Sequence, residues 1–121
     1  MPDDAIAAYD QAWNAPDAAT RTALLRQSLT PDAELVDPLA GRIRGYDAIS
    51  ARIGGFGDRY PGARVSITSN IDEHNGFARY SWTISDRDDK PLLHGIDVVE
   101  HADDHRLQRV VMFFGDMPLT N

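Results

Sequence analysis

The sequence contains no cysteine. This absence excludes disulfide bonds, thiolate nucleophiles and zinc sites built from thiolates, and it agrees with a reducing compartment. Basic residues are also outnumbered, because 12 Lys and Arg stand against 19 Asp and Glu and give a formal charge of -7. A chain with this excess of negative charge is repelled by nucleic acid phosphates and by anionic membrane surfaces. We therefore expect neither nucleic acid nor a membrane as a partner.

Long apolar runs and cofactor motifs are missing as well. No apolar stretch approaches the roughly 18 residues that span a bilayer, and the first 13 residues carry acids where a secretory signal carries bases. The sequence has no Gly-x-Ser-x-Gly motif and no P-loop, and the glycines in residues 53–57 follow a predicted helix rather than a strand. We therefore expect a cytoplasmic protein that works without a cofactor.

The four histidines do not form a metal-binding pattern. They are His74, His94, His101 and His105. His101 and His105 flank an acidic turn, and a solvated hairpin tip accounts for that arrangement. We expect no metal site.

The length and the hydrophobic content predict the architecture. With 121 residues, of which 42% are hydrophobic, the chain suits a single domain over residues 1–121. Apolar positions three and four apart predict helices, and alternating positions predict strands. The predicted helices are 4–15, 17–28 (capped by Asp17) and 46–59, and the predicted strands are 33–37, 65–71, 80–84, 92–99 and 110–114. This order predicts an α+β fold, a cone-shaped, curved, mostly antiparallel sheet with three helices packed on its concave face.

Asp97 is the first candidate functional residue, since it interrupts the apolar run of residues 92–99. Burial of an ionised carboxylate without partners costs several kcal/mol, so Asp97 must be paired, protonated or facing a cavity. Burial raises the pKa of a carboxyl, and a protonated Asp can donate a hydrogen bond. The alternative is an ion pair with Arg79 or Arg109 on neighbouring strands.

Two more polar residues lie among apolar neighbours. Asp37 ends the short strand 33–37 and precedes Pro38, where an Asp side chain commonly organises a turn. Tyr9 shares the apolar stripe of the first helix with Trp13, a position that also suits a core residue with its hydroxyl at the rim. Neither residue indicates a particular function on its own.

The order of these residues resembles the nuclear transport factor 2-like (NTF2-like) superfamily, which includes the SnoaL-like polyketide cyclases and the ketosteroid isomerases. The resemblance lies in residues 9–17, 31–33, 36–38 and 45–49 and extends to Gly115. It implies the cystatin-like α+β barrel of that superfamily. These segments are typical of the fold rather than of one activity.

Among these proteins the sequence is most similar to the bacterial ketosteroid isomerases. The resemblance implies that Asp37 is a general base, and that Tyr9 and a protonated Asp97 donate hydrogen bonds to the developing enolate oxygen. The sequence departs from the isomerases in a longer second helical region, at Gly95, and at Trp82 and Ile84.

Aromatic and aliphatic side chains on the face of Asp97 would line a pocket for a small apolar or aromatic, ketone-like ligand, or else fill a solid core. The candidate substrate-binding residues on this face are Tyr80, Trp82, Ile84, Leu93, Val99, Val110, Met112 and Phe114. Trp13, Phe56 and Tyr60, outside the strands, are further candidates.

Three functions remain open at this point. The first is an isomerase that moves a double bond next to a ketone, and the second is a SnoaL-like cyclase for an aldol step, which does not demand Tyr9. The third is a non-catalytic binding or dimerisation module. A homodimer is expected through the opposite sheet face, which presents His94, Ile96, Val98, Val111 and Phe113.

Overall fold

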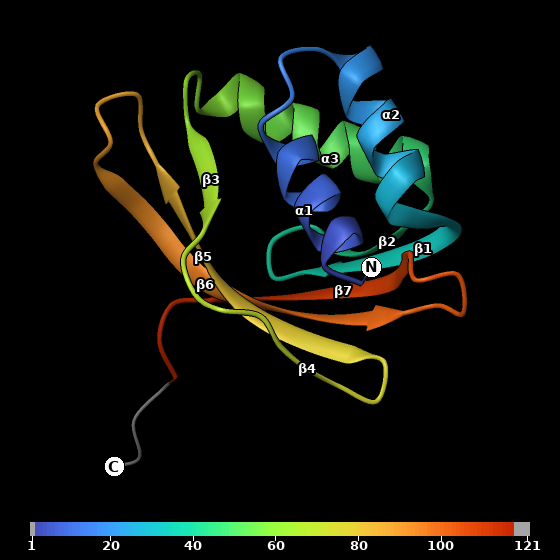
Figure 1. Ribbon diagram of the computed structural model, residues 1–121. Coiled ribbons are helices and arrows are strands. Elements are labelled where there is room, and N and C mark those ends of the chain that lie inside the picture. The colour runs from blue at the N-terminus through green and yellow to red at the C-terminus, as the bar shows by residue number, and fades with distance from the viewer. Residues whose placement is uncertain (1, 118–121) are drawn as a thin grey trace.

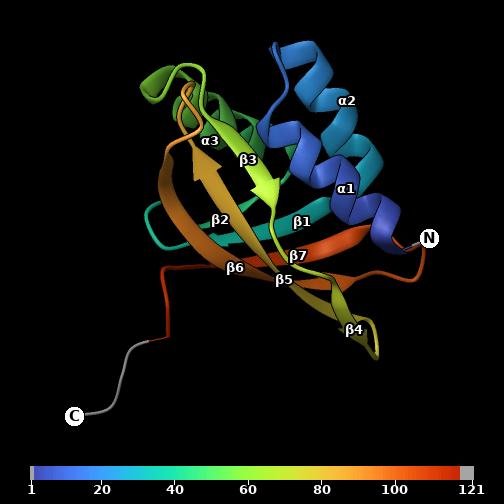
Figure 2. The same cartoon turned by 60° about the vertical axis from the view of Figure 1, so that its left-hand side comes forward.

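A computed structural model describes residues 2–117, of which the side chains are described from Asp4 onward. The elements are α1 (Pro2–Trp13), α2 (Ala18–Ser28), β1 (Leu29–Asp37), β2 (Gly41–Arg44), α3 (Tyr46–Arg59), β3 (Arg64–Ile67), β4 (Asp72–His74), β5 (Phe77–Ser85), β6 (Pro91–His101) and β7 (Leu107–Phe114). Figures 1 and 2 show the three helices together on one side of a strongly curved sheet.

The sheet has the strand order β2-β1-β7-β6-β5-β3, and β4 pairs with β5 beside β3. The β1–β7 pair is parallel and the other pairs are antiparallel. The predicted α+β fold, a curved, mostly antiparallel sheet with three helices on its concave face, is thus confirmed. Its core lies between the helices and this face.

The helices begin and end close to the predicted positions. Asp17 caps α2 as expected, because its Oδ1 accepts the backbone N–H of Thr20 at 2.7 Å. The first helix ends at Trp13, two residues before the predicted end. There the Asn14 side chain exchanges two hydrogen bonds of 2.8 Å with the backbone of Val65 and so ties the end of α1 to β3.

Several strand boundaries differ from the prediction. β1 starts at Leu29 rather than at residue 33, and β2 lies in residues 38–45, where no helix or strand was predicted. The predicted strand 65–71 ends as β3 at Ile67, and a separate strand, β4, begins only at Asp72. β2 forms because Gly41 adopts a φ of +79°, which turns the chain back so that Ile43 pairs with Leu35. Each of these boundaries depends on pairing with a strand that is distant along the chain, and local sequence patterns do not contain this information.

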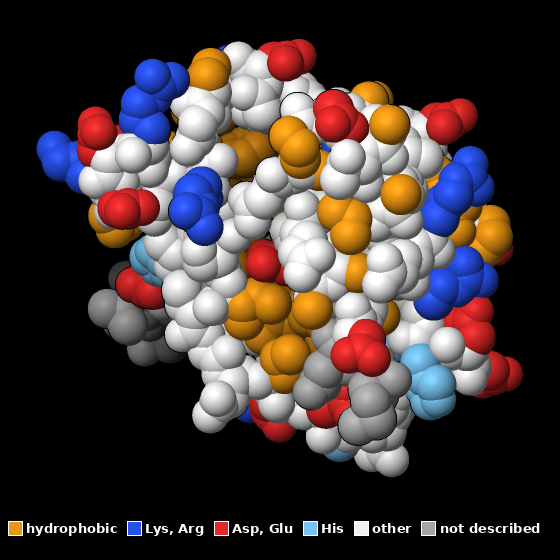
Figure 3. Space-filling model, turned by 45° about the horizontal axis from the view of Figure 1, so that its top comes forward, with side chains coloured by type: hydrophobic (Ala, Val, Ile, Leu, Met, Phe, Trp, Pro, Cys, Tyr) orange, Lys and Arg blue, Asp and Glu red, His pale blue; other side chains and the backbone are white. Residues whose placement is uncertain are grey.

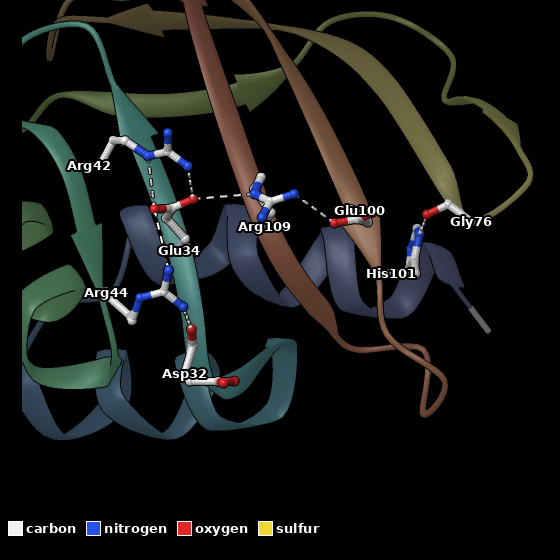
Figure 4. Close-up of polar contacts among 8 residues, drawn as sticks. All are labelled: Asp32, Glu34, Arg42, Arg44, Gly76, Glu100, His101 and Arg109. Atoms are coloured by element: carbon white, nitrogen blue, oxygen red, sulfur yellow. Dashed lines mark hydrogen bonds and ion pairs between the residues drawn. The ribbon is translucent and has the colours of Figure 1, made fainter.

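The sheet face turned away from the helices carries an ion-pair network around Glu34 (Figure 4). Arg42 binds Glu34 through Nε and Nη2 at 2.9 and 2.8 Å, and Arg109 reaches the same carboxylate at 3.3 Å while also pairing with Glu100. Hydrogen bonds from Arg42 lower the pKa of Glu34 to about 2. The network links β2, β1, β7 and β6 across the sheet.

Among residues 2–117, none of the helices combines the length and the hydropathy required to cross a membrane.

Candidate functional site

Two adjoining hollows lie between the helices and the concave face of the sheet. The inner cavity, of about 20 Å³, is lined by Tyr9, Asp10, Trp13, Val65, Tyr80, Trp82, Ile84, Asp97 and Met112. The mouth pocket, of about 450 Å³, is lined by Trp13, Leu39, Arg52, Gly55, Phe56, Arg59, Tyr60, Ile84, Leu92, Leu93, Met112 and Phe114. Trp13, Ile84 and Met112 line both, so the two hollows share a wall. Figure 3 shows hydrophobic side chains at the bottom of hollows in the surface.

The volumes set what each hollow can hold. The inner cavity has room for one group of the size of a water molecule or a carbonyl oxygen. The mouth pocket falls within the range of roughly 300–1,000 Å³ that is typical of small-molecule sites. Since Trp13, Ile84 and Met112 border both hollows, a ligand that spanned them would place its body in the mouth pocket and only a single small group in the inner cavity.

Asp97 is held at the wall of the inner cavity by two neighbours on β5. It is 5% exposed and accepts hydrogen bonds from Tyr80 Oη (3.0 Å) and Trp82 Nε1 (2.8 Å). The antiparallel register of β5 and β6 places Tyr80 directly opposite Asp97, and the alternation of side chains brings Trp82 onto the same face.

Burial is the largest influence on the pKa of Asp97 and raises it to about 7, and the charge of Asp10 adds to this effect. The hydrogen bonds from Tyr80 and Trp82 act in the opposite direction but do not cancel it. Below that pH Asp97 is neutral and has an O–H to donate.

The alternative of an arginine partner for Asp97 is wrong. Arg79 pairs with Asp72 at 2.8 Å, and Arg109 pairs with Glu34 and Glu100. Both arginines lie on the opposite face of the sheet, since side chains alternate along a strand.

Tyr9 supplies a hydroxyl without a partner. Its side chain is 2% exposed, and its buried Oη makes no hydrogen bond of good geometry with the residues that the structure describes, although the Trp13 side chain lies close enough to oppose the rise of its pKa. Burial, and after it the charge of Asp97, raises the pKa of Tyr9 well above its ordinary value, so the phenol stays protonated. A buried hydroxyl left unpaired costs about 1–3 kcal/mol. Thr30 Oγ1 is also buried and unpaired among the described residues, but of the two only Tyr9 lines a cavity.

Asp37 is buried but does not line either hollow. Its Oδ2 accepts Nε of Arg52 at 2.6 Å, and its Oδ1 accepts the backbone N–H groups of Leu39 and Ala40 at 2.8 and 3.2 Å. Burial opposes ionisation, but these bonds outweigh it and lower the pKa of Asp37. Tyr9 and Asp97 thus line one cavity, whereas Asp37 binds the backbone of a turn and the side chain of Arg52.

A second carboxylate, Asp10, lines the inner cavity and was not among the candidates predicted from the sequence. Asp10 on α1 is partly buried, and its carboxylate makes no hydrogen bond or ion pair with residues 2–117. Burial raises the pKa of Asp10 to about 6. A signal for it was present, because Asp10 lies four residues after Ile6 and three before Trp13 on the apolar face of α1.

Nine of the eleven predicted lining residues lie on the hollows. Val99 and Val110, each 1% exposed, instead belong to the core and line neither hollow. The two residues pair across β6 and β7, deeper in the sheet. The alternation of side chains along the strands correctly predicts that Val99 and Val110 face the interior. This alternation does not distinguish the wall of a cavity from a filled core.

Gly95 makes room for the Trp82 indole. A Cβ on Gly95 would collide with the Trp82 ring and with the backbone carbonyl of Phe113. Trp82 therefore lies across Gly95, packs edge-on against Phe114 with ring centroids 5.8 Å apart, and points Nε1 at Asp97. The departure from the isomerases at Gly95 is part of how the site is built.

The described residues, 2–117, contain no group of three or more His, Asp or Glu side chains arranged to hold a metal ion.

Comparison with known proteins gives a consistent result. A model of the SnoaL-like domain matches residues 6–110. The structure of a candidate isomerase of the SnoaL-like family from Agrobacterium tumefaciens is 30% identical, with a TM-score of 0.86 over 93% of this chain and 95% of that one. A candidate polyketide cyclase from Sinorhizobium meliloti is 17% identical, with a TM-score of 0.71 over 91% and 94% of the two chains, and shows the same fold. Comparison with curated proteins gives no significant match.

Proposed function

Because the chain belongs to the SnoaL-like family, we propose that it is an acid/base enzyme that needs no cofactor and shifts a proton next to a ketone through an enolate. One observation carries the proposal: the unpartnered Tyr9 hydroxyl and the Asp97 carboxyl, which is neutral below about pH 7, line the same small cavity. Both are hydrogen-bond donors, and both are shielded from water.

The substrate carbonyl oxygen enters the inner cavity while the rest of the ligand occupies the mouth pocket. As the α-proton leaves, negative charge develops on that oxygen, and the O–H groups of Tyr9 and Asp97 stabilise it. Donors fixed in a dry site do this well, because they need no reorganisation and no water competes with them. The ketone-like character of the ligand follows from this requirement.

Two carboxylates, Asp10 and Asp37, are candidates for the base that accepts the α-proton. The assignment of Asp37 as the base stays a prediction, supported by its resemblance to the isomerase residue. The contacts favour Asp10, because it lines the inner cavity with no partner in residues 2–117, whereas Asp37 is bound by Arg52 and two backbone N–H groups. A base must reach the α-proton that it removes, and Asp10 lies on the same cavity as the donors. The protonated base then returns this proton to the γ-carbon of the enolate, which completes the shift of the double bond.

A deuterium-exchange assay tests the proposal and the base together. The protein is mixed with a β,γ-unsaturated ketone in D₂O, and α-proton exchange and conjugation are followed by NMR and ultraviolet absorbance. We expect exchange above the buffer rate, a loss of about 100-fold or more in Asp10→Asn, and a smaller loss in Asp37→Asn. The exposed Asp103→Asn is the matched control and keeps the full rate. If Asp37→Asn alone abolishes exchange, Asp37 is the base, and if wild type never exceeds buffer with steroid and smaller ketones, the isomerase proposal fails.

A SnoaL-like aldol cyclisation is the second candidate, because it begins with the same α-proton removal. The structural likeness to a candidate polyketide cyclase motivates it. It needs one carboxylate and not Tyr9, so a Tyr9→Phe variant that keeps its α-proton exchange favours the cyclase. Ligand binding that persists without any exchange in wild type favours a binding module.

We further propose a cytoplasmic homodimer joined through the outer face of the sheet. On this face Ile96 pairs with Phe113 and Val98 with Val111, and Ile96 and Phe113 are 41% and 56% exposed. Contiguous exposed apolar side chains of this kind are typical of protein interfaces.

A further inference from the structure

The mouth pocket has an unusual balance of charge. The chain carries a formal charge of -7, yet no Asp or Glu lines this pocket, while two arginines, Arg52 and Arg59, do. Both come from α3, where the spacing of Arg52, Phe56 and Arg59 (i, i+4, i+7) places them on one face of the helix. The pocket is therefore an apolar hollow with positive charge at its wall.

Arg52 is held in place rather than mobile. Its Nε donates to Asp37 Oδ2 at 2.6 Å, its side chain is 20% exposed, and its guanidinium carbon lies 5.8 Å from the centre of the Trp13 ring. Asp37 is itself fixed by the N–H groups of Leu39 and Ala40. Such an anchored guanidinium binds an anion with little further loss of side-chain entropy.

The terminal nitrogens of Arg52 remain available. Nη1 and Nη2 make no hydrogen bond with any residue in 2–117, although the side chain is mostly buried and lines the pocket. A planar pair of N–H donors matches the two oxygens of a carboxylate. Arg59, exposed at the end of α3 and bonded to Tyr60 Oη at 3.2 Å, adds positive charge at the same pocket without an ion pair of its own among the described residues.

We propose that the mouth pocket binds a carboxylate with a flat apolar body, and that Arg52 receives the carboxylate while Asp37 positions Arg52. The aromatic rings of Trp13, Phe56 and Phe114 suit the flat body. This inference rests on the proposed function, and together they describe the substrate as an apolar keto acid. Its ketone oxygen lies in the inner cavity and its carboxylate lies at Arg52.

Binding of naphthoate and of its neutral isostere naphthamide tests the proposal at neutral pH. Affinities are measured by calorimetry and by quenching of tryptophan fluorescence, since Trp13 lines the pocket. We expect wild type to prefer naphthoate by about tenfold or more, as befits a charge-assisted bidentate bond. Added salt should reduce this preference.

Variants of Arg52 identify the source of the preference. Arg52→Gln should reduce the preference to less than about twofold and leave naphthamide binding unchanged. The single variant Arg52→Gln leaves the buried Asp37 carboxylate without its ion-pair partner. The double variant Arg52→Gln with Asp37→Asn therefore provides a second measurement in which no unpaired carboxylate remains. Arg79→Gln removes the same charge from the opposite sheet face and should keep the preference.

Three outcomes would overturn the carboxylate site: no binding of naphthoate at millimolar concentration, equal affinity for both probes in wild type, or a preference that survives both Arg52 variants. Asp97→Asn separates this inference from the proposed function, because it should abolish proton exchange but keep the preference for naphthoate. Failure of exchange together with an Arg52-dependent preference would leave a carboxylate-binding protein without the proposed catalysis.

Discussion

Asp97 makes the stability of the protein depend on pH. Burial raises its pKa to about 7 from an ordinary value of 3.8, so the folded state holds its proton more tightly than the unfolded chain. The stabilisation by this proton is complete below about pH 4 and is lost as the pH rises through about 7.

We therefore predict that wild type loses roughly 2–3 kcal/mol of unfolding free energy from Asp97 between about pH 5 and about pH 8. Asp97→Asn, which has no proton to lose, should show a correspondingly smaller decrease. Urea denaturation of both proteins at the two pH values measures this difference. Parallel pH dependence in the two proteins would show that Asp97 does not lose its proton between these two pH values in the folded state, which contradicts a pKa of about 7.

The hydroxyl of Tyr9 is predicted to contribute to ligand binding and not to the stability of the fold. Tyr9→Phe removes a buried hydroxyl with no partner among the described residues, so the free energy of unfolding should stay constant or rise by about 1 kcal/mol. Binding of a naphtholate, which mimics an enolate, should weaken by about tenfold or more, because one of two donors is lost. Thermal unfolding and calorimetry measure the two effects. A clear loss of stability would mean that the hydroxyl has a structural partner.

The packing of β5 against β6 depends on Gly95. A methyl group there collides with Trp82 and with the Phe113 carbonyl, so Gly95→Ala should cost roughly 2–3 kcal/mol and turn the Trp82 indole away from Asp97. Urea denaturation and the indole N–H resonance of Trp82 report the two effects. Gly57→Ala is the control, since its Cβ meets nothing within 4 Å and it lies in α3. A Gly95→Ala variant as stable as wild type would show that the strands can separate at little cost.

At the scale of elements, local patterns predicted the helices better than the strands. Apolar spacing and the Asp17 cap identified all three helices within a few residues, because these signals act within one or two turns. β2 has no local signal, because its residues, exposed except for the intermediate Ile43, form a strand only once β1 lies beside them. Strand limits depend on partners that are distant along the chain.

For the whole molecule, we predict a dimer that one added charge disrupts. Phe113→Glu places a carboxylate on the outer apolar face beside Ile96, and its desolvation on association should convert the dimer to a monomer. Light scattering coupled to size-exclusion chromatography measures the mass. Leu39→Glu adds the same charge at an exposed turn and should leave the dimer intact. A wild type that is monomeric at all concentrations refutes the interface.

The helices, the alternating strands, the α+β fold and the burial of Tyr9 and Asp97 are predictable from the amino-acid sequence, because periodicity and apolar context are local properties of the chain. The sequence alone could not determine which buried polar groups meet. Only the tertiary structure decided that Tyr80 and Trp82 bind Asp97, that Arg52 binds Asp37, and that Asp10 enters the cavity. Those contacts depend on strand register and on how α1 and α3 lie over the sheet, and a shift of one residue in register would turn each strand side chain to the other face.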